Sequence, residues 1–261
     1  MTETLPVLFD DGDIIAVNKP SGLLVHRSMI DRHETRFALQ ILRDQIGQRV
    51  YPLHRLDKPT SGVLLFARSA DAARAASTLF AERQVHKTYL AICRGHAPAA
   101  GAIDHPLKEE LDKLSDRKAR QDKPAQAALT DYRCLATATL PVAIDRYPES
   151  RFSLIECRPH TGRKHQIRRH LKHINHPIIG DAKHGKGNYN RYFKQQLNAG
   201  RLLLSATETR FPHPYKDSEI TVTAPLDSIF RRLLVHFEWC DAIPSAWLAP
   251  TDPTGKLDAT G

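Results

Sequence analysis

Asp57 is the residue of this chain whose position most strongly suggests chemistry. It lies in the stretch HRLDKPTSGVLLF, residues 54–66, between the cations Arg55 and Lys58. Pro59 disfavours helical angles at Lys58, and the Thr-Ser-Gly that follows favours a turn before an apolar strand. A carboxylate in a loop beside a rigid strand, kept ionised by neighbouring cations, is suited to nucleophilic or general-base catalysis. An ordinary ion pair or turn cap explains the same pattern, so a catalytic Asp57 needs support from elsewhere in the chain.

A second stretch, RPHTGRKHQIRRHLKH at residues 158–173, gathers basic groups. Thr161 is placed to cap a helix whose first turn holds Arg163, Lys164 and His165. Cations at this end of a helix oppose the helix dipole. Their placement is understandable if an RNA phosphate binds there, because the free backbone N–H groups add to the attraction. The sequence therefore predicts RNA contacts at these residues.

Arg168 differs from the other cations of this predicted helix. Ile167, Leu171 and Ile174 have the spacing of a buried stripe. Arg168 borders that stripe, and a guanidinium drawn partly into the core needs a carboxylate partner. Asp57 is a candidate for that partner. A surface arginine that extends its charged end into solvent explains the position equally well.

Tyr89 lies in KTYLAI, a predicted strand. Strand alternation puts it on the same face as Ala91 and Cys93. The ring can stack on an RNA base or pack in the core, and the apolar surroundings favour core packing.

Several kinds of cofactor site are disfavoured by the motifs. The clustered histidines lack an HExxH motif and a nearby carboxylate as third ligand, so they do not indicate a metal site; they are His165, His170, His173 and His176. The glycine-rich phosphate loops GxGxxG and GxxxxGK[ST] are absent, as is GxSxG. We expect neither a metal nor an organic cofactor.

The elements that must position these residues form an α+β pattern. Strands occur in hairpin runs with single helices between them, which predicts a largely antiparallel mixed sheet with flanking helices. The polar stretch at 184–201 is expected to lack an element. Helices are predicted within 34–48, 71–84 (capped by Ser69), 165–174 and 228–239, and strands after the first hairpin near 62–67, 87–95, 128–139, 151–159, 202–211 and 219–225.

The domain organisation follows from the same pattern. With 41% hydrophobic residues among 261, the chain can bury a substantial core. We expect one catalytic domain over residues 1–243, with a charged surface excursion at about 104–126. Residues 244–261, rich in Pro, Asp, Thr and Gly, are expected to form a mobile tail.

Charge and cysteine content indicate the partner and the compartment. Lys plus Arg exceed Asp plus Glu by 38 − 29, a formal charge of +9, which favours an anionic partner such as nucleic acid. The four cysteines show no CxxC spacing, which is typical of a reducing cytoplasm. No stretch has the pattern of a signal peptide or a membrane span. A cytoplasmic monomer without membrane contact is expected.

Taken together, HRLDKPTSGVLLFA, KTYLAI and TGRKHQIRRHLKHINHPIIGD resemble the pseudouridine synthases of the RluA family, over residues 7–237. The resemblance implies that Asp57 is the nucleophile, that Tyr89 is the tyrosine of the family's KxY strand, and that Arg168 pairs with the aspartate. It also implies that Arg55 helps to hold the target nucleotide outside its helix. The activity implied is isomerisation of uridine to pseudouridine in RNA, without a cofactor.

The chain is most similar to a branch of this family that acts on uridine 65 of tRNA, at the base of the T-stem. Lys164 and Arg169 stand where the wider family more usually has Thr and Val, and we expect both to contact RNA. The resemblance begins near the N-terminus, so the catalytic domain and its insertion are expected to hold the tRNA without an S4-type domain. An rRNA substrate, or RNA binding without catalysis, stays open as an alternative. The sequence does not separate attack of Asp57 on the sugar, attack on the base and removal of a sugar proton.

Overall fold

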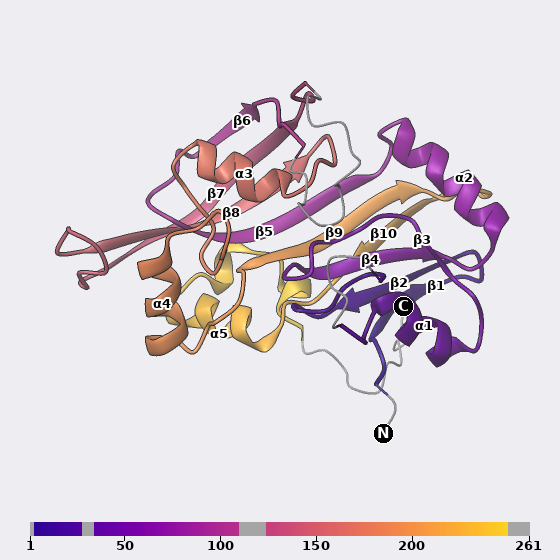
Figure 1. The fold of residues 1–261 in the computed structure, drawn as a ribbon, viewed down its shortest axis with the longest axis horizontal. Helices are drawn as coiled ribbons and strands as arrows, with labels where there is room; N and C mark the ends of the chain where they lie inside the picture. The colour runs from indigo at the N-terminus through magenta and orange to yellow at the C-terminus, as the bar shows by residue number, and fades with distance from the viewer. Residues whose placement is uncertain (1–2, 28–33, 110–123, 250–261) are drawn as a thin grey trace.

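The computed structural model describes residues 3–27, 34–109 and 124–249. Within these, a single ten-stranded sheet has the order β1-β2-β4-β9-β5-β8-β7-β6, with β10 paired to β9 and β3 to β4. Only the β4–β9 pair among these is parallel, so the predicted α+β fold with a largely antiparallel sheet is confirmed (Figure 1). The strands are β1 (Val7–Asp10), β2 (Ile14–Lys19), β3 (Tyr51–Pro52), β4 (Ser61–Ala67), β5 (His86–Arg94), β6 (Ala100–Asp104), β7 (Leu129–Leu140), β8 (Ser150–Pro159), β9 (Leu204–Pro212) and β10 (Glu219–Thr223).

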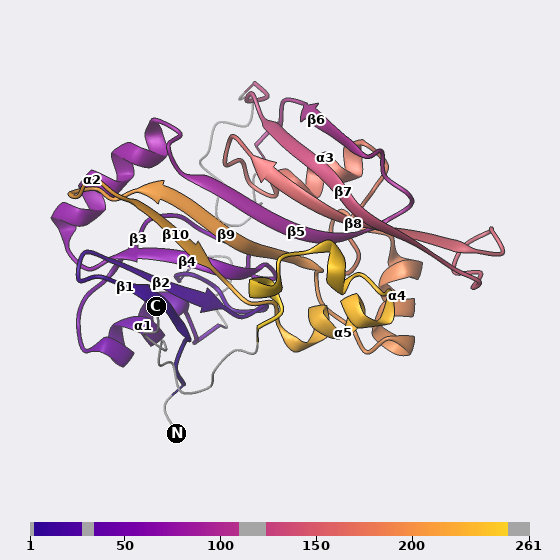
Figure 2. The ribbon, with the colours of Figure 1, turned by 180° about the vertical axis from the view of Figure 1, so that it is seen from behind.

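Helices flank the sheet at both of its ends. The two views agree that α2 lies at one end, and that α4 and α5 lie together at the other, near the long hairpin of β7 and β8 (Figures 1 and 2). In the described part of the chain, no helix is both long and apolar enough to cross a bilayer. The helices are α1 (Ala38–Ile46), α2 (Ala70–Ala81), α3 (Gln166–His173), α4 (Gly187–Gln196) and α5 (Ser228–His236), followed by the 3₁₀ turns η1 (Cys240–Ala242) and η2 (Ser245–Trp247).

Strand β4 is buried on both faces, as its run of apolar residues predicts. Leu64 and Phe66 face a core cluster to which α1, α3, α4 and α5 also contribute. Val63 and Leu65 face a second cluster that includes α2. Because β4 follows directly on the Asp57 loop, packing on both faces fixes one end of that loop.

The conformation of Gly62 explains why β4 begins with Ser-Gly. Its φ is +108°, and an added Cβ would collide with the carbonyl oxygen of Ala206 in β9. Only a glycine allows the two parallel strands to approach so closely at this point. Beside it, the Ser61 hydroxyl donates to Ser205 at 3.1 Å, which ties the start of β4 to β9.

Two sequence predictions about elements need correction. Helix α4 occupies the stretch expected to have no element, because Tyr189 and Phe193, four residues apart, bury their rings in the core while most other residues of the helix are polar. The packed region also extends past residue 243, since Trp247 is buried and its carbonyl accepts the Leu226 N–H at 2.8 Å. Residues 250–261 of the predicted tail and 110–123 of the predicted insertion lie outside the described residues.

Candidate active site

Asp57 lies in the loop between β3 and β4, and its side chain is 28% exposed. The turn that follows β2 holds this loop in place through two hydrogen bonds. The Ser21 hydroxyl donates to the Pro59 carbonyl at 2.7 Å, and the Gly22 N–H donates to the Lys58 carbonyl at 2.8 Å. The sequence KPSG thus supports the sequence DKPTSG, although the two are some forty residues apart along the chain.

Lys19 also joins this turn to the loop, and sequence reasoning missed it. The residue is fully buried. Its ammonium donates to the carbonyls of Pro20 at 2.9 Å, Leu23 at 2.8 Å and Lys58 at 3.2 Å. Burial lowers the pKa of Lys19 to about 7, and the charge of Asp57 opposes that decrease. The signal in the sequence was a lysine at the end of an otherwise apolar strand, IIAVNK.

Replacing Lys19 by methionine should change how stability depends on pH. The folded pKa of about 7 lies below the unfolded value of 10.5, so the unfolded wild type binds more protons in that window and its stability rises with pH. Lys19→Met lacks this increase. Between pH 7 and pH 9, the free energy of unfolding of the wild type should rise by about 2 kcal/mol relative to that of the variant, as measured by urea unfolding. Lys172→Met, at an exposed lysine, is the control, and parallel profiles for wild type and Lys19→Met would contradict the lowered pKa of Lys19.

The predicted ion pair between Asp57 and Arg168 is present. Arg168 Nη1 donates to Asp57 Oδ2 at 2.9 Å. A second acid, which the sequence did not reveal, holds the rest of the guanidinium: Nε and Nη2 donate to the two carboxylate oxygens of Asp181 at 2.7 and 2.8 Å. Such a bidentate pair fixes the plane of the guanidinium. The guanidinium that contacts Asp57 is therefore buried and held in a fixed orientation by Asp181.

Asp181 is itself held by its own loop. Its side chain is fully buried, and Oδ1 accepts the backbone N–H groups of Lys183 and His184, each at 2.9 Å. Burial alone would raise the pKa of Asp181, but the Arg168 guanidinium and these N–H groups outweigh it and lower the pKa. Burial likewise opposes the charge of Arg168, and the two acids together raise its pKa. The charged forms are thus the stable ones.

Tyr89 and Lys87 line the pocket into which Asp57 faces. They are two residues apart on β5, so they project from the same face of the strand. Burial, with a smaller effect from Asp57, raises the pKa of the Tyr89 phenol well above its ordinary value, and burial lowers the pKa of Lys87. The phenol is therefore a hydrogen-bond donor near neutral pH, and sequence reasoning missed the lysine beside it.

The other predicted residues divide into two groups. Arg55, Arg163 and His165 line the same pocket as Asp57, and the His165 Nε2 atom lies 3.9 Å from Asp57 Oδ2. Lys164 and Arg169 do not line it. Arg169 Nη1 instead donates to the carbonyl of Lys108 at 2.9 Å, so this cation contacts the backbone of the predicted insertion.

The start of helix α3 differs from the predicted one. The helix begins at Gln166, and His165 before it is left-handed, with φ of 57°. Thr161 does not cap the helix: its hydroxyl donates to Gln166 Oε1 at 2.7 Å, and the same oxygen accepts the Arg163 N–H at 3.0 Å. The basic residues therefore form a turn tied to the helix by a glutamine side chain, and this turn forms one wall of the Asp57 pocket.

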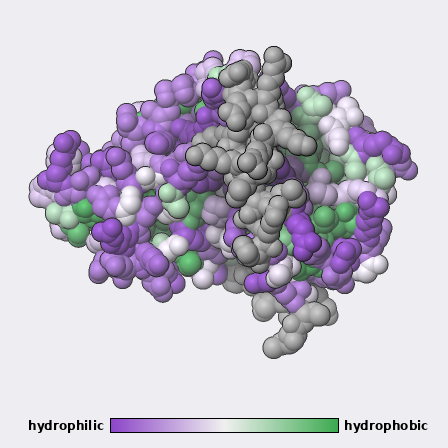
Figure 3. Space-filling model, in the orientation of Figure 1, coloured by the Kyte–Doolittle hydropathy of each residue, from purple (hydrophilic) through white to green (hydrophobic). Residues whose placement is uncertain are grey.

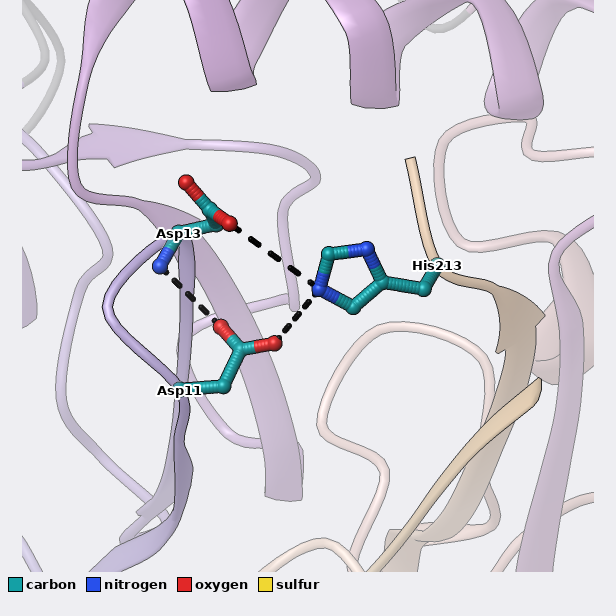
Figure 4. A group of neighbouring side chains, drawn as sticks. All are labelled: Asp11, Asp13 and His213. Atoms are coloured by element: carbon teal, nitrogen blue, oxygen red, sulfur yellow. Dashed lines mark hydrogen bonds and ion pairs between the residues drawn. The ribbon is translucent and has the colours of Figure 1, made fainter. Parts of the chain in front are cut away.

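One group of side chains has the spacing of a metal site, and it lies away from this pocket. Asp11 and Asp13 face His213 (Figure 4). His213 Nδ1 accepts the N–H groups of Tyr215 and Lys216 at 3.0 and 3.2 Å, so Nε2 carries the proton and donates it to Asp11 at 2.6 Å. Both ring nitrogens are thus engaged, and the group clamps the β1–β2 turn to the β9–β10 hairpin.

The predicted helix histidines also have protein partners. His170 contacts the Thr130 hydroxyl at 2.9 Å and the His105 carbonyl at 3.0 Å, and His176 contacts the Arg94 carbonyl at 3.0 Å. These contacts tie α3 and the segment after it to the sheet, which accounts for both rings without a ligand.

The pocket therefore combines an aspartate oriented by a buried arginine, a protonated tyrosine and a rim of cations. Comparison with protein families shows that residues 13–173 match the RNA pseudouridylate synthase family, a segment that includes Lys19, Asp57, Tyr89 and Arg168. The chain belongs to this family. As a pseudouridylate synthase it is an isomerase, and the predicted resemblance is confirmed.

Individual relatives of this pseudouridylate synthase agree. The tRNA pseudouridine synthase C of Vibrio cholerae is 51% identical over 92% of this chain and 98% of its own. That of Pasteurella multocida is 50% identical over 90% and 97%. Among solved structures, human RNA Pseudouridylate Synthase Domain Containing 4 is 29% identical, with a TM-score of 0.67 over 89% of this chain and 92% of its own.

Proposed function

We propose that this pseudouridylate synthase acts on tRNA and converts uridine 65, at the base of the T-stem, into pseudouridine. The observation that carries the proposal is the chain of ion pairs from Asp181 through Arg168 to Asp57. Its first two members are buried, and it holds the Asp57 carboxylate in a pocket with Tyr89. The choice of tRNA is supported by relatives about half identical over nearly the whole chain that are named tRNA pseudouridine synthase C.

The reaction breaks the N1–C1′ bond, turns the uracil and joins C5 to C1′, while N1 gains a proton and C5 loses one. The target must leave its stack to reach Asp57, at a cost of a few kcal/mol that contacts with the surrounding RNA offset. Arg55, Arg163 and His165 at the pocket rim are suited to those contacts. Asp57 then acts as the nucleophile on the sugar or on the base, or removes a sugar proton.

Tyr89 is best suited to stack on the uracil and to donate a hydrogen bond. Its raised pKa means that the phenol must first lose its own proton before it could accept the one from C5. The proton from C5 therefore needs another acceptor or a proton relay that includes the phenol. Tyr89 is therefore proposed to stack on the uracil and donate a hydrogen bond, and not to act alone as the base that takes the C5 proton.

Mapping of pseudouridines formed in vitro tests the substrate. The purified protein is incubated with unmodified tRNA and, separately, with rRNA, and pseudouridines are located by chemical labelling and primer extension. We expect one new pseudouridine, at uridine 65 of tRNA, and none in a tRNA with cytidine at that position. Modification of an rRNA site with tRNA unchanged would overturn the tRNA assignment and favour the rRNA alternative.

A further inference from the structure

A second hollow lies at the far end of the strands that carry the active site. It is bounded by the end of β5, the tip of the β7–β8 hairpin and the start of α4, and the hairpin projects from one end of the molecule in Figure 1. Its volume is about 520 Å³, against about 100 Å³ for the Asp57 pocket, which is within the range of small-ligand sites. We call it the hairpin hollow, and the residues that line it include Arg94, Tyr147, Glu149, Arg151 and Tyr189.

Arg94 gives the hairpin hollow an uncompensated positive charge. Its guanidinium carbon lies 5.2 Å from the centre of the buried Tyr189 ring, and its Nε is buried without a hydrogen-bond partner. Within the described residues, no carboxylate forms an ion pair with Arg94. Glu149 does not supply one, because it pairs with Arg151 at 2.6 Å. A half-buried cation without an acceptor favours an anionic ligand.

Tyr147 adds an aromatic surface beside this charge. It is 51% exposed, and it is one of three exposed large hydrophobic residues in the part of the chain that the structure describes. The Arg146 guanidinium carbon lies 4.8 Å from the ring centre. An exposed tyrosine next to arginines is suited to stack on a nucleic-acid base while the arginines contact phosphates. Exposed Asp145 limits the local excess of positive charge, so the anion is expected at Arg94 and the base at Tyr147.

The hairpin hollow and the Asp57 pocket lie at opposite ends of the same strands. On β8, Arg151 lines the hollow and Pro159 lines the pocket, eight positions apart, or about 26 Å along the strand. On β5, Arg94 lines the hollow and Tyr89 the pocket. Helix α3 contributes to the pocket and helix α4 to the hollow, and both helices pack into one core cluster. The face of the molecule shown in Figure 3 is predominantly hydrophilic. A polynucleotide can reach both sites, whereas a small ligand cannot.

We propose that the hairpin hollow binds a nucleotide of the RNA substrate remote from the target uridine, with its phosphate at Arg94 and its base against Tyr147. The proposal rests on the proposed action on tRNA and adds a second anchoring point to it. Such an anchor selects RNA by its size and shape, because only an RNA that extends far enough from the target occupies both sites.

Binding measurements test the anchor independently of catalysis. The dissociation constant is measured by fluorescence anisotropy for whole tRNA and for a stem-loop that holds the target uridine but is too short to reach the hollow. Arg94→Met and Tyr147→Ala should each weaken tRNA binding about tenfold and leave stem-loop binding unchanged. Arg94→Met should also reduce the salt dependence of tRNA binding by about one ion. Arg74→Met, at an exposed arginine of α2, is the control.

The outcomes separate the two proposals. Unchanged tRNA affinity in both variants would show that the hairpin hollow does not bind RNA. The same result is expected if the hollow binds an acidic protein segment instead. Equal weakening for tRNA and stem-loop would overturn it as a remote site. If both variants weaken tRNA binding as expected but the wild type forms no pseudouridine at position 65, the proposed function is contradicted and the anchor is still supported.

Discussion

Asp57→Asn is expected to lower the rate of pseudouridine formation at least about a thousandfold, with tRNA binding close to that of the wild type. Asparagine keeps the size of the side chain and can still accept the hydrogen bond from Arg168 Nη1, which spans 2.9 Å in the wild type. It lacks the negative charge that a nucleophile or base needs. Because RNA is an anion, loss of one negative charge at the pocket should not weaken its binding.

Release of tritium from tRNA labelled at C5 of uridine measures the reaction, and filter binding measures affinity. Asp71→Asn, an exposed acid of α2 paired with Arg74, should behave as the wild type in both. Equal release by wild type and Asp57→Asn would rule out the proposed role of the carboxylate. Loss of binding and release together would indicate a folding defect, which the unfolding curve of the variant would reveal.

Arg168→Met should destabilise the protein by about 3–5 kcal/mol at neutral pH, because it leaves the buried Asp181 carboxylate without its cation. Activity should also fall, since Asp57 loses the group that orients it. Arg168→Lys keeps a positive charge but cannot reproduce the two parallel bonds to Asp181, so it should retain more stability than Arg168→Met. Urea unfolding measures the free energies, with Arg169→Met as the neighbouring control.

The pH dependence of Arg168→Met distinguishes this cause from lost packing. In the wild type the pKa of Asp181 is lowered below 3.8, so its stabilising contribution is present above the unfolded pKa and is lost only as pH falls through the lower folded value. Without Arg168, burial raises the pKa instead, and the variant becomes less stable as pH rises above about 4. The stability difference should therefore be larger at pH 7 than at pH 4.5. A constant difference would attribute the loss to packing.

The predicted helix boundaries agree with the structure where residues close in sequence determine them. Ser69 caps α2, its hydroxyl accepting the Ala72 N–H at 3.1 Å, and left-handed Gly47 ends α1. Both depend on residues within a few positions. Helix α4 was missed because only two of its rings, Tyr189 and Phe193, are fully buried in the core, so a polar composition concealed a helix that tertiary packing stabilises.

By itself, the sequence marked Asp57 and Arg168 as candidates through their positions, and the family resemblance added Tyr89. The charge excess pointed to nucleic acid. From the residues alone, the pairing of Asp57 with Arg168 was one of two open interpretations. The structure shows it directly, because it brings residues 111 positions apart within 2.9 Å. The tertiary structure alone revealed Asp181 and Lys19 as the groups beneath them. A buried charge is recognisable only from what surrounds it, and those surroundings come from distant segments: Lys19 needs the carbonyl of Lys58, and Asp181 needs the fork of Arg168.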